Sequence, residues 1–169
     1  MNKPAYCIFL VDDNIMYLNA GKAALQKKYT VITIPSGEKL LRILQQHKPD
    51  LILLDIEMPH MNGYEVIKKI KENPDTKEIP VIFLTGKNEI ENELMGLTLG
   101  AVDYITKPFS QSLLLKRVEM HLLLKAQTNE LRVLNNNLLE LVLERTREIS
   151  DLQSAIFMKA KFVNVLRHT

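Results

Sequence analysis

The sequence predicts an α/β fold, a doubly wound five-stranded parallel sheet with helices on both faces. Two observations predict it: five short apolar runs alternate with segments of helical period, and turn residues mark the junctions between them. The chain has 169 residues, which suffices for one domain and an appendage. Its composition, 46% hydrophobic and 25% charged, is typical of a globular protein, and its single cysteine excludes a disulfide framework.

The five predicted strands are short and rich in aliphatic residues, as expected of strands buried on both faces. In chain order they are Tyr6–Val11, Val31–Ile34, Leu51–Leu54, Val81–Leu84 and Ala101–Ile105. Between them lie segments with a helical period: Ile15–Tyr29, Glu38–His47, Tyr64–Glu72 and Glu89–Leu99. The junctions carry glycine or small polar residues, such as Ser36-Gly37, Asn62-Gly63, Gly86 and Gly100.

From Phe109 onwards the pattern is helical only, and no Pro or Gly follows Pro108. The first part repeats apolar residues at helical spacing and is expected to pack on the sheet: Leu115, Val118 and Leu122. A heptad-like run follows in a new phase, with a four-residue step near Arg145 that resembles a stutter: Leu131, Leu134, Leu138, Leu141, Ile149, Leu152 and Ile156.

An unbroken helix over this region would be on the order of 80 Å long at ~1.5 Å per residue, longer than the preceding domain. We therefore expect its outer part to pair with a second copy of the chain as a coiled-coil homodimer; a hairpin of two helices is the alternative. The predicted division is a domain over 1–122, followed by a coiled-coil helix over 123–169 that links to an output domain missing from this sequence.

The net charge of the chain is close to zero, at +2. Residues 1–109 carry 13 Lys and Arg against 14 Asp and Glu, and residues 110–169 carry 9 against 6, which gives −1 and +3. Nucleic-acid binding usually needs a concentrated basic face, so we expect no direct nucleic-acid contact. No targeting signal or membrane-spanning apolar stretch is visible, which predicts a cytoplasmic protein without a membrane partner.

Three carboxylates follow predicted strands. Asp12 and Asp13 end the first, and Asp55 ends the third. Side chains at the carboxyl ends of parallel strands converge on one crevice, and carboxylates that share a site repel one another unless a cation is present. Hard oxygen ligands suit Mg²⁺. A helix cap is the alternative for Asp13-Asn14 alone.

A hydroxyl and an ammonium complete this edge. Thr85 follows the fourth strand, and Lys107 follows the fifth and precedes Pro108 through a bond that is a candidate for the cis form. A metal, a hydroxyl and an ammonium around a carboxylate are what an aspartyl phosphate requires, because each binds or neutralises a phosphoryl oxygen.

Residues 6–122 resemble the receiver domain of bacterial two-component response regulators, which has a flavodoxin-like fold. The resemblance rests on four ordered stretches: Val11-Asp12-Asp13-Asn14, Asp55-Ile56-Glu57-Met58-Pro59-His60-Met61-Asn62-Gly63, Leu84-Thr85-Gly86 and Gly100-Ala101-Val102-Asp103-Tyr104-Ile105-Thr106-Lys107-Pro108-Phe109. Gly86 departs mildly from the family, which often has Ala there.

The resemblance implies a role for each site residue. Asp55 would accept a phosphoryl group from a sensor histidine kinase or a phosphotransfer protein. Asp12, Asp13, Asp55 and the backbone carbonyl of Glu57 would hold Mg²⁺. Lys107 would pair with the phosphoryl group, Thr85 would move toward it, and Tyr104 would rotate inward as a switch. Such a chain is not an enzyme with its own substrate; self-dephosphorylation is the most that is expected.

Two questions stay open at this stage. The second functional hypothesis is a dimeric scaffold that works without phosphorylation, although a scaffold has no need of the acid, Thr and Lys set.

The segment Glu144–Ile149 resembles connectors that precede output domains, and the continuation resembles either a histidine-kinase helix around His168 or the linker of an HD-GYP-type cyclic-di-nucleotide phosphodiesterase. The remaining histidines, His47, His60 and His121, are interpreted as surface residues.

Overall fold

The computed structural model of the chain describes residues 6–86 and 97–167, and side chains as far as residue 164. It divides into two compact units, Met1–Lys125 and Ala126–Thr169, which are described separately.

The first unit is built on a five-stranded, wholly parallel sheet in the order β2-β1-β3-β4-β5. Its strands are β1 (Cys7–Val11), β2 (Thr30–Ile34), β3 (Leu51–Asp55), β4 (Val81–Thr85) and β5 (Asp103–Thr106). The predicted doubly wound sheet is therefore confirmed. The differences lie at the strand ends. β1 begins one residue later and β2 one residue earlier than predicted, and β5 begins two residues later. β3, β4 and β5 run one residue further than predicted, so that Asp55 and Thr85 are the last residues of their strands.

Three helices connect the strands: α1 (Ile15–Leu25), α2 (Gly37–Ile43) and α3 (Gly63–Glu72). Each is capped at its start by a side-chain oxygen, from Asn14, Ser36 and Asn62 respectively. The first two end four residues before the predicted positions Tyr29 and His47. The helical spacing persists there because both N–H groups still bond to carbonyls four residues back, in turns that are not helix.

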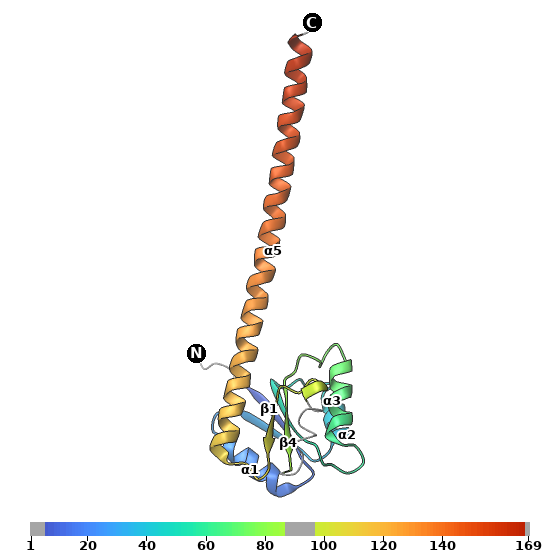
Figure 1. Cartoon of the computed structure of the whole chain (residues 1–169), viewed down its shortest axis with the longest axis vertical. Coiled ribbons are helices and arrows are strands. Elements are labelled where there is room, and N and C mark those ends of the chain that lie inside the picture. The colour runs from blue at the N-terminus through green and yellow to red at the C-terminus, as the bar shows by residue number, and fades with distance from the viewer. Residues whose placement is uncertain (1–5, 87–96, 168–169) are drawn as a thin grey trace. The chain divides into compact units, whose positions relative to one another are not determined.

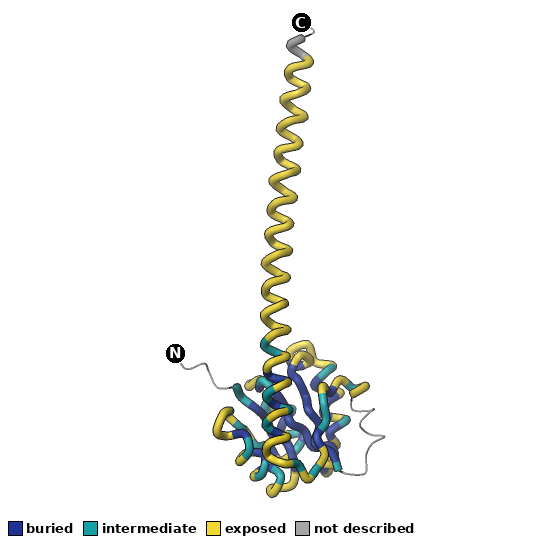
Figure 2. The backbone as a smooth tube through the Cα atoms, turned by 60° about the vertical axis from the view of Figure 1, so that its left-hand side comes forward, coloured by how far each residue is buried: buried dark blue, intermediate teal, exposed yellow. Residues whose placement is uncertain are grey.

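Helices lie on both faces of the sheet (Figure 1), and buried residues concentrate on the strands (Figure 2). A separate hydrophobic core lies between the sheet and the helices on each face. On one face the strands pack against α2 and α3 through Leu40, Val66, Ile67 and Ile70. On the other they pack against α1 and the first part of α5 through Leu18, Leu25, Leu114, Val118 and Leu122. The strand residues between them, such as Phe9 and Leu53, are fully buried.

The helix predicted at Glu89–Leu99 falls mostly on residues 87–96, which lie outside the described residues. Leu97 and Thr98 are helical, and a turn at Gly100 with φ +100° leads toward β5.

Helix α5 (Gln111–Arg167) is one helix of 57 residues. The continuous helix is confirmed, and the hairpin alternative is wrong. Residues Leu114, Val118 and Leu122 of α5 are buried in the first unit, whereas the predicted core residue Leu115 is only partly buried. In the second unit, residues 127–164 are all exposed (Figure 2). Among the described residues, no helix is long and apolar enough to cross a membrane.

Candidate functional site

The four strand ends bring the predicted site residues to the carboxyl edge of the sheet. Asp12 follows β1, Asp55 and Thr85 end β3 and β4, and Lys107 follows β5. The hollow at this edge has a volume of about 240 Å³ and is lined by Asp12, Asp13, Asn14, Tyr17, Asp55, Glu57, Gly86 and Lys107. It has room for an ion, a phosphoryl group and several waters, since each water takes up about 30 Å³ in the liquid.

The three acidic residues form one group. Carboxylate oxygens of Asp12, Asp13 and Asp55 all lie within 4.8 Å of one another. Asp12 is fully buried and Asp55 is 4% exposed, whereas Asp13 is exposed. The backbone N–H of Asn14 donates to Asp12 Oδ1 over 2.9 Å and orients that carboxylate. An all-oxygen set that is open to solvent on one side suits Mg²⁺, which keeps part of its water shell.

Lys107 is the cation that faces these carboxylates. Its Nζ lies 2.6 Å from Asp12 Oδ2 and 2.8 Å from Asp55 Oδ1, and its side chain is 10% exposed. Burial lowers the pKa of the ammonium, but the hydrogen bonds and charges of Asp12 and Asp55 outweigh it, so the net pKa is raised and Lys107 stays charged. The Lys107-Pro108 bond is cis.

The surroundings of Asp55 raise the pKa of its carboxyl group. Burial raises its pKa most, Lys107 lowers it, and the charges of Asp12 and Asp13 raise it further, with a net pKa of about 6. The ionised form of Asp55 is disfavoured by burial and by the neighbouring negative charges, so a bound cation or a covalent group on the carboxylate would be stabilising.

The two predicted switch residues lie on neighbouring strands, Thr85 at the end of β4 and Tyr104 within β5. Thr85 is 1% exposed, and its Oγ1 has no hydrogen-bond partner among the described residues. A buried hydroxyl without a partner is costly, and it is free to bind an incoming oxygen. Tyr104 is partly buried and packs against the core on the α2 and α3 face.

The loop from Asp55 to α3 is fixed by close backbone packing. Gly63 donates its N–H to the Ile56 carbonyl over 2.9 Å, and a Cβ at position 63 would lie 2.5 Å from the carbonyl oxygen of Asp55. Asn62 and Glu65 form a capping box at the start of α3. Only glycine fits at position 63 without moving the backbone of Asp55.

One site residue, Tyr17, was missed by sequence reasoning. The Tyr17 ring lies under the Lys107 ammonium, with 4.3 Å from Nζ to the ring centroid, and also contacts the Phe109 ring. The helix cap considered for Asp13-Asn14 is made by Asn14, which caps α1 and also lines the hollow. The spacing of α1 contained the signal for Tyr17: it lies one helical turn after the Asp13-Asn14 pair.

One interpretation from the sequence is wrong. His121, expected on the surface, is 9% exposed, and its Nε2 lies 3.0 Å from Asp103 Oδ2. The available signal was its spacing: His121 lies three residues after the buried Val118, and residues three apart share one side of a helix. His47 and His60 are exposed as expected.

This fold and site define a class of protein: α/β domains that gather acidic residues, a hydroxyl and a lysine around one aspartate at the carboxyl edge of a parallel sheet. The profile of the response regulator receiver domain matches residues 8–119, and the chain belongs to this family.

Relatives support the assignment. The chain is 47% identical over 152 residues, 88% of its length, to a protein of Vibrio cholerae named "Probable cyclic di-GMP phosphodiesterase", and 37% identical over 128 residues, 74% of its length, to the response regulator PleD of Caulobacter vibrioides. It spans only 34% and 28% of those two relatives. The chemotaxis response regulator CheY4 of Vibrio cholerae superposes with a TM-score of 0.66 at 30% identity, over 69% of this chain and 98% of that one.

Proposed function

We propose that this domain is a phosphorylation-dependent signal receiver, in which Asp55 accepts a phosphoryl group from a sensor histidine kinase or a phosphotransfer protein. An oxygen of the Asp55 carboxylate forms a bond to phosphorus while the bond from phosphorus to the donor's imidazole nitrogen breaks. The observation that carries the proposal is the Lys107 ammonium, which lies 2.8 Å from that carboxylate inside the acidic group.

The residues around Asp55 fit a bound Mg²⁺. Asp12, Asp13, Asp55 and the backbone carbonyl of Glu57 would hold it, and the ion would neutralise charge on the phosphoryl oxygens. Lys107 would pair with a second phosphoryl oxygen, and Oγ1 of Thr85, which has no hydrogen-bond partner within the described part of the chain, would donate to a third. Movement of Thr85 would leave room for Tyr104 to rotate inward, which makes these two residues the switch.

The test is phosphorylation by a small phosphodonor, acetyl phosphate, followed by intact mass spectrometry. We expect one added phosphoryl group in the presence of Mg²⁺ and none when EDTA is present or when Asp55 is replaced in Asp55→Asn. Addition that persists in Asp55→Asn would overturn the proposal. A domain that is never labelled would support the scaffold hypothesis in its place.

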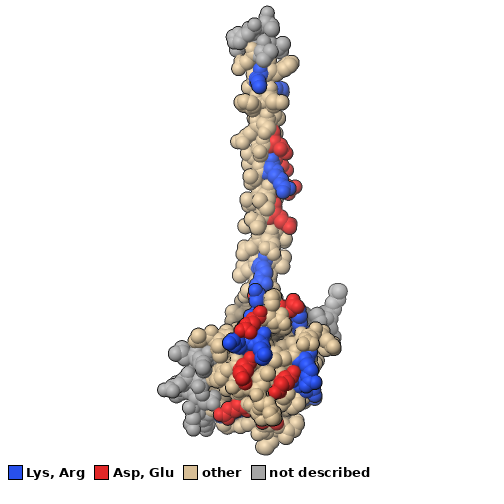
Figure 3. Space-filling model, turned by 90° about the vertical axis from the view of Figure 1, so that its right-hand side faces the viewer, with Lys and Arg blue, Asp and Glu red and all other residues tan. Residues whose placement is uncertain are grey.

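We further propose that residues 127–164 of α5 pair with the same segment of a second copy. Large apolar side chains in this segment are half to two-thirds exposed, among them Leu131 (60%), Leu138 (57%) and Ile156 (67%). Charged side chains gather between Glu140 and Asp151, with mostly uncharged stretches on either side (Figure 3). A row of exposed apolar side chains is unfavourable in water, and heptad pairing with a second helix would bury it.

The output that best fits is cyclic di-GMP hydrolysis, which we propose on the likeness to the Vibrio cholerae protein. That match covers more residues than the first unit contains, so it continues into the second. The corresponding activity would not lie in the residues described. Its test is the cellular level of cyclic di-GMP when the protein is produced as wild type or as Asp55→Asn: a level that does not respond to Asp55 would contradict this output.

A further inference from the structure

Within the first unit, residues 111–125 of α5 make polar contacts with three other places among the described residues. Lys28 pairs with Glu119, Lys125 contacts Asp50, and Asp103 contacts both Arg117 and His121. The first two pairs are substantially solvated: the side chains of Lys28 and Glu119 are 57% and 37% exposed, and that of Asp50 is 37% exposed. Solvated ion pairs of this kind contribute little to the free energy of folding.

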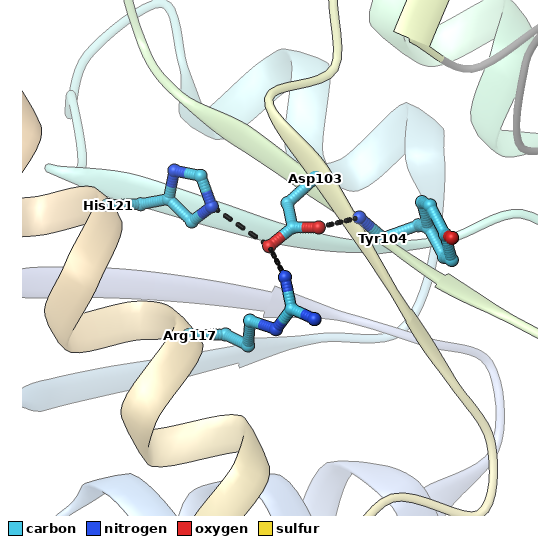
Figure 4. A network of polar contacts seen from close by, with 4 residues as sticks. All are labelled: Asp103, Tyr104, Arg117 and His121. Carbon is cyan, nitrogen blue, oxygen red and sulfur yellow. Dashed lines mark hydrogen bonds and ion pairs between the residues drawn. The ribbon is translucent and has the colours of Figure 1, made fainter.

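The contact through Asp103 is different. Its side chain is 12% exposed, and its Oδ2 accepts from Arg117 Nη1 over 2.8 Å and contacts His121 Nε2 over 3.0 Å (Figure 4). Arg117 and His121 are four residues apart, so they lie one above the other on the same side of α5. One carboxylate thus holds two successive turns of the helix.

The same carboxylate also holds the backbone of the proposed switch residue. Asp103 Oδ1 accepts from the Tyr104 N–H over 2.9 Å, while the Tyr104 ring lies away from the carboxylate (Figure 4). Neighbouring side chains on a strand point to opposite faces, so Asp103 faces α5 whereas Tyr104 packs on the opposite core. A rotation of Tyr104 that changes the backbone at 103–104 therefore moves the group that holds α5.

Charge on the carboxylate is stabilised by its partners. Burial raises the pKa of Asp103, but hydrogen bonds from His121, the Tyr104 N–H and Arg117 lower it more, so the net pKa is below the ordinary value and Asp103 is ionised at neutral pH. The charged contact is accordingly present under physiological conditions.

We infer that Asp103 is a positioning residue that couples β5 to α5, so that a change at Tyr104 is transmitted to the helix through Arg117 and His121. This inference rests on the proposed receiver function and adds the residue that connects the switch to the helix. Asp103 touches none of the reacting groups, so its loss should spare phosphoryl acceptance and remove the response of α5.

The experiment uses the full chain with and without Mg²⁺ and beryllofluoride, a mimic of the phosphoryl group. Hydrogen exchange of the α5 amides at residues 111–125 reports the helix response, and labelling by acetyl phosphate reports the site. In Asp103→Asn we expect labelling within about twofold of wild type and a beryllofluoride-induced exchange change of less than half the wild-type change. The matched control Asp50→Asn removes a second carboxylate that contacts α5, at Lys125 and away from Tyr104, and should keep the full response.

A double variant, Arg117→Gln with His121→Gln, removes the helix side of the contact and should give the same loss if Asp103→Asn does not fold. An undiminished exchange response in whichever variant folds overturns the inference, as does an equal loss in Asp50→Asn. Failure of the wild type to be labelled would instead overturn the proposed function, and the inference with it. A merely structural role of Asp103 would alter exchange equally with and without beryllofluoride, which also counts against the coupling.

Discussion

The Lys107 ammonium contacts both the Asp55 and the Asp12 carboxylates, and the balance among these three charges sets the chemistry of the hollow. Its raised pKa of about 6 means that the folded, metal-free domain binds a proton at Asp55 more tightly than the unfolded chain, whose ordinary carboxyl pKa is 3.8. The ionised form of Asp55 therefore destabilises the metal-free fold, and Mg²⁺ binding or phosphorylation would remove this destabilisation.

The first prediction concerns stability against pH. A group with a raised folded pKa stabilises the fold fully below pH 3.8, and this contribution is lost as the pH rises through about 6. In EDTA at pH 7, Asp55→Asn should therefore raise the free energy of unfolding, by on the order of 2 kcal/mol. The gain should shrink as the pH falls from 7 to 4. Urea unfolding across this range measures it, and a less stable Asn variant at pH 7 would contradict the account of Asp55.

The second prediction concerns the Thr85 hydroxyl, which is buried and has no hydrogen-bond partner among the described residues. Thr85→Val keeps the shape of the side chain and removes the unsatisfied group. We expect the metal-free domain to become more stable by about 1 kcal/mol, while the affinity for beryllofluoride with Mg²⁺ falls about tenfold. Thermal unfolding and a beryllofluoride titration measure the two effects. Loss of stability together with unchanged affinity would show that the hydroxyl has no role in binding.

At the scale of elements, the loop between β3 and α3 determines the position of the Asp55 backbone. The third prediction compares two glycines there and at the end of β4. Gly63→Ala should destabilise the fold by about 2 kcal/mol or more, because its Cβ would lie 2.5 Å from the Asp55 carbonyl oxygen. Gly86→Ala meets no described atom within 4 Å and should change stability by less than about 1 kcal/mol. Equal effects of the two substitutions in urea unfolding would contradict this account.

The periodicity of the apolar residues was sufficient to predict most helices and strands of the first unit. All five strands and three of the connecting helices follow from apolar spacing, since strands buried on both faces are distinctive. The helix ends were less accurate, because turn residues after α1 and α2 kept the spacing of the helix. The Glu89–Leu99 prediction stays a prediction, because most of that segment lies outside the described residues.

The site was also largely predictable, because parallel strands bring their ends to one edge of the sheet. Topology alone therefore placed Asp12, Asp55, Thr85 and Lys107 together. Contacts between side chains of different elements were not predictable in the same way. The stacking of Tyr17 on Lys107 and the burial of His121 against Asp103 depend on how α1 and α5 are rotated on the sheet, and apolar spacing fixes that rotation only roughly.

At the scale of the whole molecule, the proposed dimer depends on the helical segment at 127–164. The fourth prediction compares two leucines of similar exposure, Leu138 (57%) in the heptad run and Leu143 (52%) outside it. Leu138→Asp should make the chain monomeric at concentrations where wild type and Leu143→Asp are dimers, because only the first puts a charge into the paired face. Light scattering measures the mass. A monomeric wild type, or two variants that behave alike, would contradict the heptad pairing.

The proposed signal starts at one residue, so the account depends most on the identity of the phosphoacceptor. The direct measurement is to phosphorylate the full chain with acetyl phosphate and Mg²⁺, reduce the acyl phosphate with borohydride, and find the converted residue by peptide mass spectrometry. The account predicts homoserine at position 55 and at no other aspartate, and no conversion in EDTA. Conversion at Asp12 or Asp13, or a phosphoryl group retained on a histidine, would contradict it.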